Sequence, residues 1–145
     1  MRLLVQRSKN SSVSVDNKVV GQIDFGLVVL VGFTENDTFK DIEYLVKKLV
    51  NLRIFDDENH IMNKSVLDVN GSVLSISQFT LYADCKKGNR PSYSKAMSAL
   101  NASKMYDLFN EELRKYIHVE CGIFQADMNV FITNDGPVTI LLESE

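Results

Sequence analysis

The chain has 145 residues, of which 45% are hydrophobic and 24% charged, so a sizeable core is possible without disulfide or metal staples. The length suits one domain and is too short for two, and we expect a single domain over residues 1–145. With 16 basic and 19 acidic residues the formal net charge is -3, which argues against non-specific wrapping of nucleic acid but permits a local basic patch.

The cysteines and the first residues of the chain point to the cytoplasm. Cys85 and Cys121 form no CxxC pair, which fits a reducing, cytosolic setting. Residues 1–7 turn polar too soon for a signal peptide. The longest apolar run, residues 27–31, is far shorter than the ~20 residues of a membrane span. We therefore expect a soluble cytoplasmic protein with no membrane segment.

The first third of the chain predicts a hairpin followed by a buried strand. Residues 3–15 and 19–23 are expected to pair through a turn at 16–18. Gly26 is expected to break the second strand of this hairpin. The run 27–31 is rich in β-branched residues without alternation, which predicts a separate strand buried on both faces.

A helix is predicted next, capped by Asp37 or Thr38 and running to about Leu52. Its apolar positions at helical spacing are Ile42, Leu45, Val46, Leu49 and Val50. Residues 53–55 are expected to start another strand, and residues 56–59 to form a polar turn.

The second half of the chain predicts one more helix among short strands. A strand is expected over residues 72–79 and a polar loop over 85–90. Asn101 is expected to cap a second helix, whose apolar stripe is Met105, Leu108, Phe109, Leu113 and Tyr116. Three short strands close the chain, at 119–120, 128–133 and 138–142. We expect an α/β fold of three layers, α/β/β, with mixed or antiparallel sheets: two helices cover one sheet, and the remaining strands form a second layer against its other face.

Two short segments stand where apolar runs stop, at residues 77–80 (Ser-Gln-Phe-Thr) and 134–139 (Asn-Asp-Gly-Pro-Val-Thr). Both place hydroxyl, amide or bare backbone groups at a strand end, where a rigid scaffold can present chemistry. The Gly136-Pro137 step removes a ladder donor and a side chain. It is either an ordinary trans turn or a cis bond whose two carbonyl oxygens face a pocket and grip an ammonium group.

The sequence offers little sign of orthodox catalytic chemistry. Thr80 would need a base to act as a nucleophile, and neither His60 nor His118 lies in a motif beside it. A strand-end hydroxyl bonded to backbone is the competing interpretation of Thr80. No group of residues has metal-ligand spacing, and no nucleotide-binding motif is present. We expect no metal and no cofactor.

Residues 77–80 match the SQxT motif of the D-aminoacyl-tRNA deacylases, and residues 134–139 match their NxGPxT motif. The resemblance extends over nearly the whole chain. It includes Val5-Gln6-Arg7, Arg53-Ile54-Phe55, Met62-Asn63, Gly71-Ser72-Val73-Leu74, Arg90-Pro91-Ser92-Tyr93, Gly122, Phe124 and Ala126. Both motifs in this order, in a chain of this length, form a specific signal.

The resemblance implies a homodimer that hydrolyses the ester bond of D-aminoacyl-tRNA, excludes L-aminoacyl-tRNA and also clears glycine mischarged on alanine tRNA. It implies a cis Gly136-Pro137 bond inserted into the active site of the partner subunit. That loop would lie across the dimer interface from Gln78, Phe79 and Thr80, the expected catalytic residues. The expected substrate-binding residues are Gly136, Pro137, Arg7, Ser77, Ala126 and Met128.

Several of these roles have a plain structural alternative. Arg7 either holds the Gly-Pro loop through its carbonyls or is a surface charge on an edge strand, and Met128 either adjoins the pocket or belongs to the core. The basic loop residues Lys86, Lys87 and Arg90 either meet acceptor-stem phosphates or are simply solvated. One position departs from the family pattern: Gln125 stands where a small residue is usual, which bears on fine substrate preference.

Three other functions compete with this one. The chain is alternatively a non-catalytic RNA-binding or replication-associated module, although it lacks interleaved basic and aromatic residues. It is alternatively a structural homodimer in which Gly136-Pro137 is only a turn. The third alternative is a related deacylase with a trans Gly-Pro bond that accepts L-alanyl-tRNA.

Overall fold

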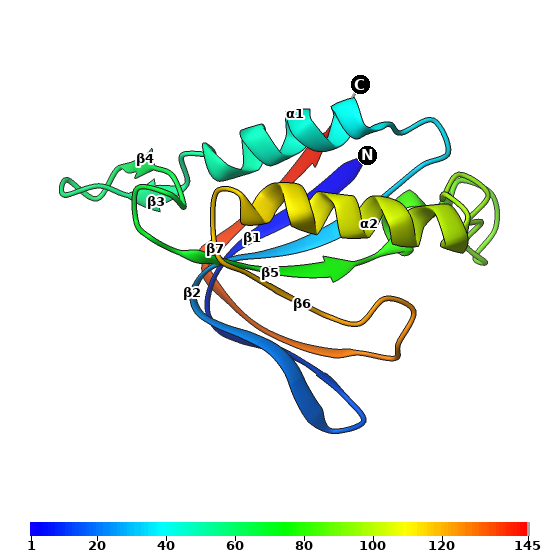
Figure 1. Ribbon diagram of the computed structural model, residues 1–145, viewed down its shortest axis with the longest axis horizontal. Coiled ribbons are helices and arrows are strands. Elements are labelled where there is room, and N and C mark those ends of the chain that lie inside the picture. Colours follow the sequence, from blue (N-terminus) through cyan, green and yellow to red (C-terminus); the bar gives the residue numbers. More distant parts are fainter. Residues whose placement is uncertain (145) are drawn as a thin grey trace.

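The computed structural model describes residues 1–144 and shows two helices packed on one face of a curved, mixed sheet (Figure 1). The elements in chain order are β1 (Arg2–Val15), β2 (Lys18–Gly32), α1 (Phe39–Val50), β3 (Phe55–Asp56), β4 (Met62–Lys64), β5 (Ser72–Ser77), α2 (Ala99–Arg114), β6 (Val119–Cys121) and β7 (Asn129–Glu143). The main sheet has the strand order β6-β5-β2-β1-β7, and β3 pairs with β4 in a small separate sheet. Strands β2, β5 and β6 run parallel, whereas β1 is antiparallel to both β2 and β7.

Both predicted helices are present, with shifted boundaries. Thr38 is the N-cap of α1, and its amide donates to Asp41 Oδ2 at 2.7 Å, so the amide of the cap has an acidic partner. All five predicted apolar positions of α1 are buried. The cap predicted for α2 is wrong: Ser98 is the N-cap, and Asn101 lies inside the first turn. A small polar residue next to a helical stripe fits a cap in sequence, and only the backbone path decides between two candidates.

The predicted stripe of α2 is correct at three of its five positions, because Met105 also packs, partly buried, against the core. Phe109 and Leu113 are buried, but Leu108 is 39% exposed and Tyr116 49% exposed, and Tyr116 lies beyond the helix end. The face that packs on the sheet is instead Ala102, Tyr106, Phe109 and Leu113. That face mixes a small side chain with aromatic ones, so hydrophobicity alone does not identify it.

Two predicted strand breaks do not occur. Strand β2 continues through Gly26, which has a φ of +142°. A Cβ atom at that position would lie 1.9 Å from the Ser72 carbonyl oxygen, so the glycine permits the close approach of β5 rather than a chain break. Likewise β7 is one strand across Gly136-Pro137, not two.

Other strand limits also differ from the prediction. The strand predicted over 72–79 ends at Ser77, and Phe79 begins a short 3-10 turn (Phe79–Tyr82). Strand β3 starts at Phe55 rather than at residue 53. The pattern does not predict β4, because residues 62–64, exposed or half-buried, carry no apolar alternation.

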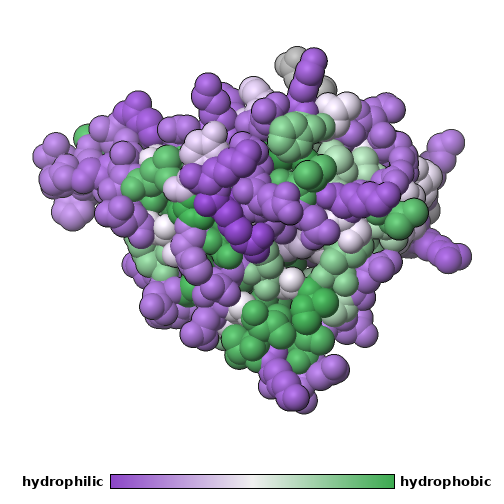
Figure 2. All heavy atoms as spheres, viewed as in Figure 1, coloured by the Kyte–Doolittle hydropathy of each residue, from purple (hydrophilic) through white to green (hydrophobic). Residues whose placement is uncertain are grey.

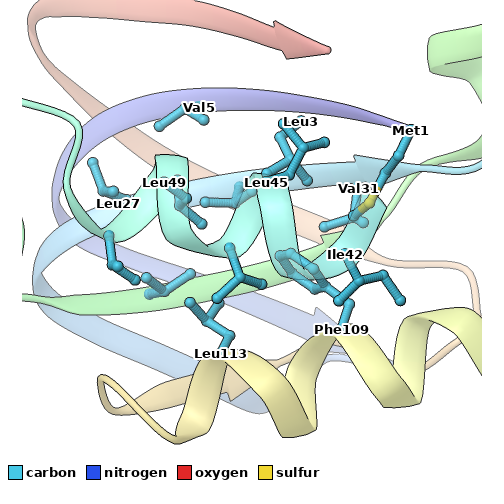
Figure 3. Close-up of a cluster of buried hydrophobic side chains, with 14 of the residues drawn as sticks. Met1, Leu3, Val5, Leu27, Val31, Ile42, Leu45, Leu49, Phe109 and Leu113 are labelled. Carbon is cyan, nitrogen blue, oxygen red and sulfur yellow. The ribbon is translucent and has the colours of Figure 1, made fainter. Parts of the chain in front are cut away.

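The core lies on both faces of the sheet. The larger cluster fills the space between the helices and the sheet, and Figure 3 shows Ile42, Leu45, Phe109 and Leu113 pointing into it. The smaller cluster, on the opposite face, contains Val13, Ile23, Val28, Leu74 and Ile76, with Val130 and Ile132 of β7 against it. The prediction that separate strands form the second layer is therefore wrong. That layer is formed by the same long strands where they curl over (Figure 1).

Apolar side chains reach the surface at the far end of these long strands, as Figure 2 shows at the lower end of the molecule. Val19, at the start of β2, is 58% exposed, and Phe131 of β7 is 65% exposed. Within residues 1–144, neither helix has the length and apolarity that a membrane crossing requires.

Gly26→Ala is expected to lower the free energy of unfolding by more than about 3 kcal/mol, because the new methyl group would overlap the Ser72 backbone. The matched control is Gly88→Ala. Gly88 also has a positive φ, +69°, but nothing lies within 4 Å of its added Cβ, so only about 1 kcal/mol is expected. Urea unfolding measures both, and equal losses would contradict the close approach of β5.

Candidate active site at the carboxyl ends of the parallel strands

A pocket of about 640 Å³ opens where the three parallel strands end. Its lining takes Val31 from the end of β2, Ser77 from the end of β5, and the segment 124–128 that follows β6. The start of α2 supplies Ala99 and Ala102 as a further wall. Ligand sites in open α/β sheets form at this edge, because the chain leaves each parallel strand there and its loops converge.

The predicted segment 77–80 lies at this pocket. Ser77, Gln78 and Phe79 line it, whereas Thr80 does not. The Gln78 amide donates to the Val31 carbonyl at 2.7 Å, which fixes the backbone as it leaves β5. The Gln78 side chain donates from Nε2 to Thr80 Oγ1 at 2.5 Å. Thr80 therefore holds Gln78 in place at the pocket edge.

The amides of Phe79 and Thr80 open the 3-10 turn that follows β5. Within residues 1–144 neither amide has a hydrogen-bond acceptor, because the turn begins with them. Two adjacent main-chain donors of this kind can receive a negatively charged oxygen.

A buried hydrogen-bond group supports the far wall of the pocket. The Ser75 carbonyl accepts both the Tyr106 hydroxyl at 2.7 Å and the Gly122 amide at 3.1 Å. The Tyr106 ring lies 6.0 Å from the ring of Phe124, which lines the pocket. Burial raises the pKa of Tyr106 to about 12, so its hydroxyl stays a neutral donor at physiological pH. Ala126 and Met128 line the same wall, and Met128 also packs on the smaller core cluster.

Side-chain chemistry in the pocket is sparse. His60 and His118 are exposed and line no part of it. Cys121 lies outside the lining, and burial raises the pKa of its thiol, which disfavours a thiolate nucleophile. Within residues 1–144 no group of three His, Cys, Asp or Glu side chains could hold a metal ion. The lining does contain one carboxylate, the exposed side chain of Asp127, which sequence reasoning missed. Its only sequence signal is its place beside Ala126.

Gly136 and Pro137 project from the middle of β7. The pairing of β1 with β7 passes from Gln6–Thr139 to Ser8–Asn134, so four residues of β7 stand opposite Arg7 alone. Gly136 and Pro137 are both exposed, and the bond between them is cis.

Arg7 is buried beneath this loop, so the alternative of a surface charge is wrong. Its Nη1 donates to the Ile54 carbonyl at 2.9 Å, and its Nε donates to the Asp135 carbonyl at 3.3 Å. The Asp135 carboxylate lies 3.2 Å from Arg7 Nε and 3.0 Å from Lys9 Nζ. Arg7 thus contacts the carbonyl just before Gly136, not those of Gly136 and Pro137 themselves.

The two predicted halves of the site do not meet within one chain. Arg7, Gly136 and Pro137 are absent from the pocket lining. Arg7 pairs with Leu27 of β2, near the beginning of the segment parallel to β5, whereas the pocket starts at Val31. Within residues 1–144 the loop and the pocket therefore do not form one continuous site.

The basic loop lies close to the pocket mouth. Lys86, Lys87 and Arg90 are exposed, and the loop is closed by a bridge between Asp84 and Ser92. Directly after the bridge, Tyr93 lines the pocket, and its ring meets that of Phe79 edge-on at 5.0 Å. The base of the basic loop thus adjoins an aromatic pair of the pocket.

Fold and site together define a small mixed α/β protein with an open, largely apolar pocket and free main-chain donors at its edge. Comparison identifies its family. The family model described as "D-Tyr-tRNA(Tyr) deacylase" matches residues 4–143. A Bacillus cytotoxicus protein named "D-aminoacyl-tRNA deacylase" is 57% identical over 146 residues, covering 100% of each chain. A Bacillus cereus protein of the same name is 58% identical, with the same coverage. The chain belongs to the D-Tyr-tRNA(Tyr) deacylase family and is an enzyme, a hydrolase acting on ester bonds.

Two solved structures share the fold. One, named "c-Myc DNA Unwinding Element Binding Protein", has a TM-score of 0.95 and 42% identity, and the match covers 100% of this chain and 99% of the other. The second, described as a probable eukaryotic D-amino acid tRNA deacylase, has a TM-score of 0.84 at 17% identity and 97% coverage of each chain. At that identity the second match shows the fold alone.

Arg7→Met is expected to lower the free energy of unfolding by about 2–4 kcal/mol, because it leaves the Ile54 and Asp135 carbonyls without a donor and removes one of the two cations beside the Asp135 carboxylate. Lys9→Met is the control. Lys9 binds the other oxygen of the same carboxylate, but its side chain is 53% exposed, so about 0–1 kcal/mol is expected. Chemical unfolding compares the two, and a similar loss in both would show that burial of Arg7 contributes nothing.

Proposed function

We propose that this chain hydrolyses the ester bond of D-aminoacyl-tRNA in the cytoplasm, giving free D-amino acid and tRNA, and that it also clears glycine from alanine tRNA. The observation that carries the proposal is the pocket lined by Ser77, Gln78 and Phe79 in a member of this family. Its volume of about 640 Å³ is within the usual ~300–1,000 Å³ for small-molecule sites and suits the aminoacyl-adenosine end of a tRNA.

The proposed enzyme is a homodimer in which each protomer completes the site of its twin. In support, Gly136 and Pro137 are exposed and follow Asp135, whose carbonyl Arg7 holds, yet neither residue belongs to the lining of the described pocket. Exposed apolar side chains such as Val19 and Phe131 offer surface for a second copy.

In this proposal the main chain of Gly136 and Pro137, without any side chain, distinguishes D- from L-aminoacyl esters. The Gly136 and Pro137 carbonyls would hold the α-ammonium group while the pocket holds the ester. The side chain and the hydrogen atom then occupy the two remaining positions on the α-carbon. In a D-amino acid the side chain points outward, whereas in an L-amino acid it would collide with the Gly-Pro segment. Glycine has no side chain to strike it and passes. Such a filter is indifferent to which D-amino acid is attached.

Hydrolysis in this scheme relies on the substrate. The 2′-hydroxyl of the terminal ribose is next to the ester by covalent structure, so it is well placed to orient or activate a water. The free amides of Phe79 and Thr80 would stabilise the developing oxyanion, and Gln78 would orient the terminal nucleoside or the water. Lys86, Lys87 and Arg90 would meet acceptor-stem phosphates in a salt-dependent way.

The direct test is ester loss from D-tyrosyl-tRNA, L-tyrosyl-tRNA and D-tyrosyl-tRNA ending in 2′-deoxyadenosine. The D form should be hydrolysed and the L form spared. The deoxy form should react about 10²–10⁴-fold more slowly, because it lacks the group that activates water. Asp127→Asn, which removes the one lining carboxylate, should keep most of the activity.

The outcomes separate the alternatives. Rapid hydrolysis of the 2′-deoxy substrate, together with an inactive Asp127→Asn variant, would identify Asp127 as the general base. Release from neither D nor L form would favour a binding module, such as the DNA-element binding for which the 42% identical structure is named. The net charge of -3 argues against that role.

Cross-subunit assembly is tested by mixing two weakened variants. Ala126→Phe fills the pocket, and Gly136→Ala places a Cβ 2.9 Å from Val138 Cγ2 and 3.1 Å from Arg7 Nη2. Each homodimer should be slow. Random heterodimers would contain one intact composite site, so co-refolded protein should regain about a quarter of the wild-type rate. No gain over the separate variants would place loop and pocket in independent roles.

A further inference from the structure

Gln125 occupies a backbone conformation that glycine would adopt more easily. The Ala126 amide donates to the Ile123 carbonyl at 3.2 Å, which closes a four-residue turn. Gln125 is the third residue of that turn and has a φ of +63°. Turns with positive φ at this position favour glycine or asparagine, because a Cβ there crowds the neighbouring carbonyl. A glutamine in that place therefore costs stability.

The side chain that incurs this cost lies at the pocket. Gln125 lines it, is exposed, and makes no hydrogen bond with residues 1–144, so its carbonyl oxygen and amide nitrogen are both free for a ligand. The other carboxamide of the lining, Gln78, already uses its nitrogen to hold Thr80. Backbone strain kept at a site is a sign of function rather than of packing.

We propose that Gln125 is a specificity-determining residue whose carboxamide hydrogen-bonds the edge of the terminal adenine of the tRNA. This inference rests on the proposed function. A glutamine amide pairs its donor and acceptor with adenine N7 and N6. The exposed rings of Phe79 and Tyr93 in the same lining offer a face or an edge to the base. The D-amino-acid side chain is a poorer partner, since the chiral filter directs it out of the pocket.

The proposal predicts opposite changes in stability and affinity. Gln125→Gly relieves the positive φ and should raise the Tm by about 2 °C, while weakening binding of the adenosine end. Gln125→Met keeps the length of the side chain but removes the carboxamide, so it should weaken binding without raising the Tm. A residue with a purely structural role would not produce this split.

The probe is D-tyrosyl-3′-amino-3′-deoxyadenosine, whose amide bond resists hydrolysis, compared with the same compound carrying unsubstituted purine, which lacks the N6 amino group. Wild-type protein should lose about two- to tenfold in Kd with the purine analogue, the share of the one hydrogen bond to N6. Gln125→Met should bind both compounds alike, and at least as weakly as wild type binds the purine form, because it loses the bond to N7 as well as the bond to N6. Its KM for D-tyrosyl-tRNA should rise with little change in kcat.

Equal affinity of wild type for the two compounds, or an unchanged Kd in Gln125→Met, would overturn the assignment. A lower Tm in Gln125→Gly would overturn the claim of strain at this turn. A wild-type chain that discriminates the two compounds but releases no D-tyrosine from tRNA would refute the proposed function and leave the role of Gln125 in place.

Discussion

The parallel pairing of β2 with β5 is the constraint on which the rest of the molecule depends. It brings Val31 and Ser77 together at the carboxyl ends of the two strands, and these strand ends line the pocket. The pairing requires backbone to approach backbone at Gly26, where any Cβ would meet the Ser72 main chain. Because β6 extends the same parallel set, residues 124–128 leave the sheet at the same edge and close the far wall.

A second constraint acts through one buried guanidinium. Arg7 links the chain just after α1, through the Ile54 carbonyl, to the Asp135 carbonyl of β7. Paired and hydrogen-bonded on several sides, a buried charge of this kind fixes the geometry of what it binds. The exposed Gly136-Pro137 step is therefore presented on a rigid base, although the residues themselves pack little against their own chain.

The sequence predicts well whatever depends on local pattern. The helical spacing of the apolar residues predicts the helix over residues 39–50 and its buried face. The residue types of segments 77–80 and 134–139 identify the two motifs. The sequence does not predict features that depend on contacts with residues far along the chain. Local rules predict that Gly26 ends a strand, whereas in the fold the strand continues and Gly26 lies against the Ser72 backbone. The burial of Arg7 depends on Ile54 and Asp135, which no neighbouring residue reveals. Asp127 reaches the pocket through the path of the chain after β6, with no motif to announce it.

The place of β7 in the sheet gives the Gly-Pro step an additional meaning. β7 is an outermost strand of 15 residues, and a long outermost strand invites other polypeptides to join it. Pro137 offers no N–H, and the outward excursion opposite Arg7 interrupts the row of main-chain groups near its middle. This interruption makes the outer border of the sheet a poor template for adding a further strand, so the Gly-Pro step is expected to disfavour edge-to-edge association and fibril growth.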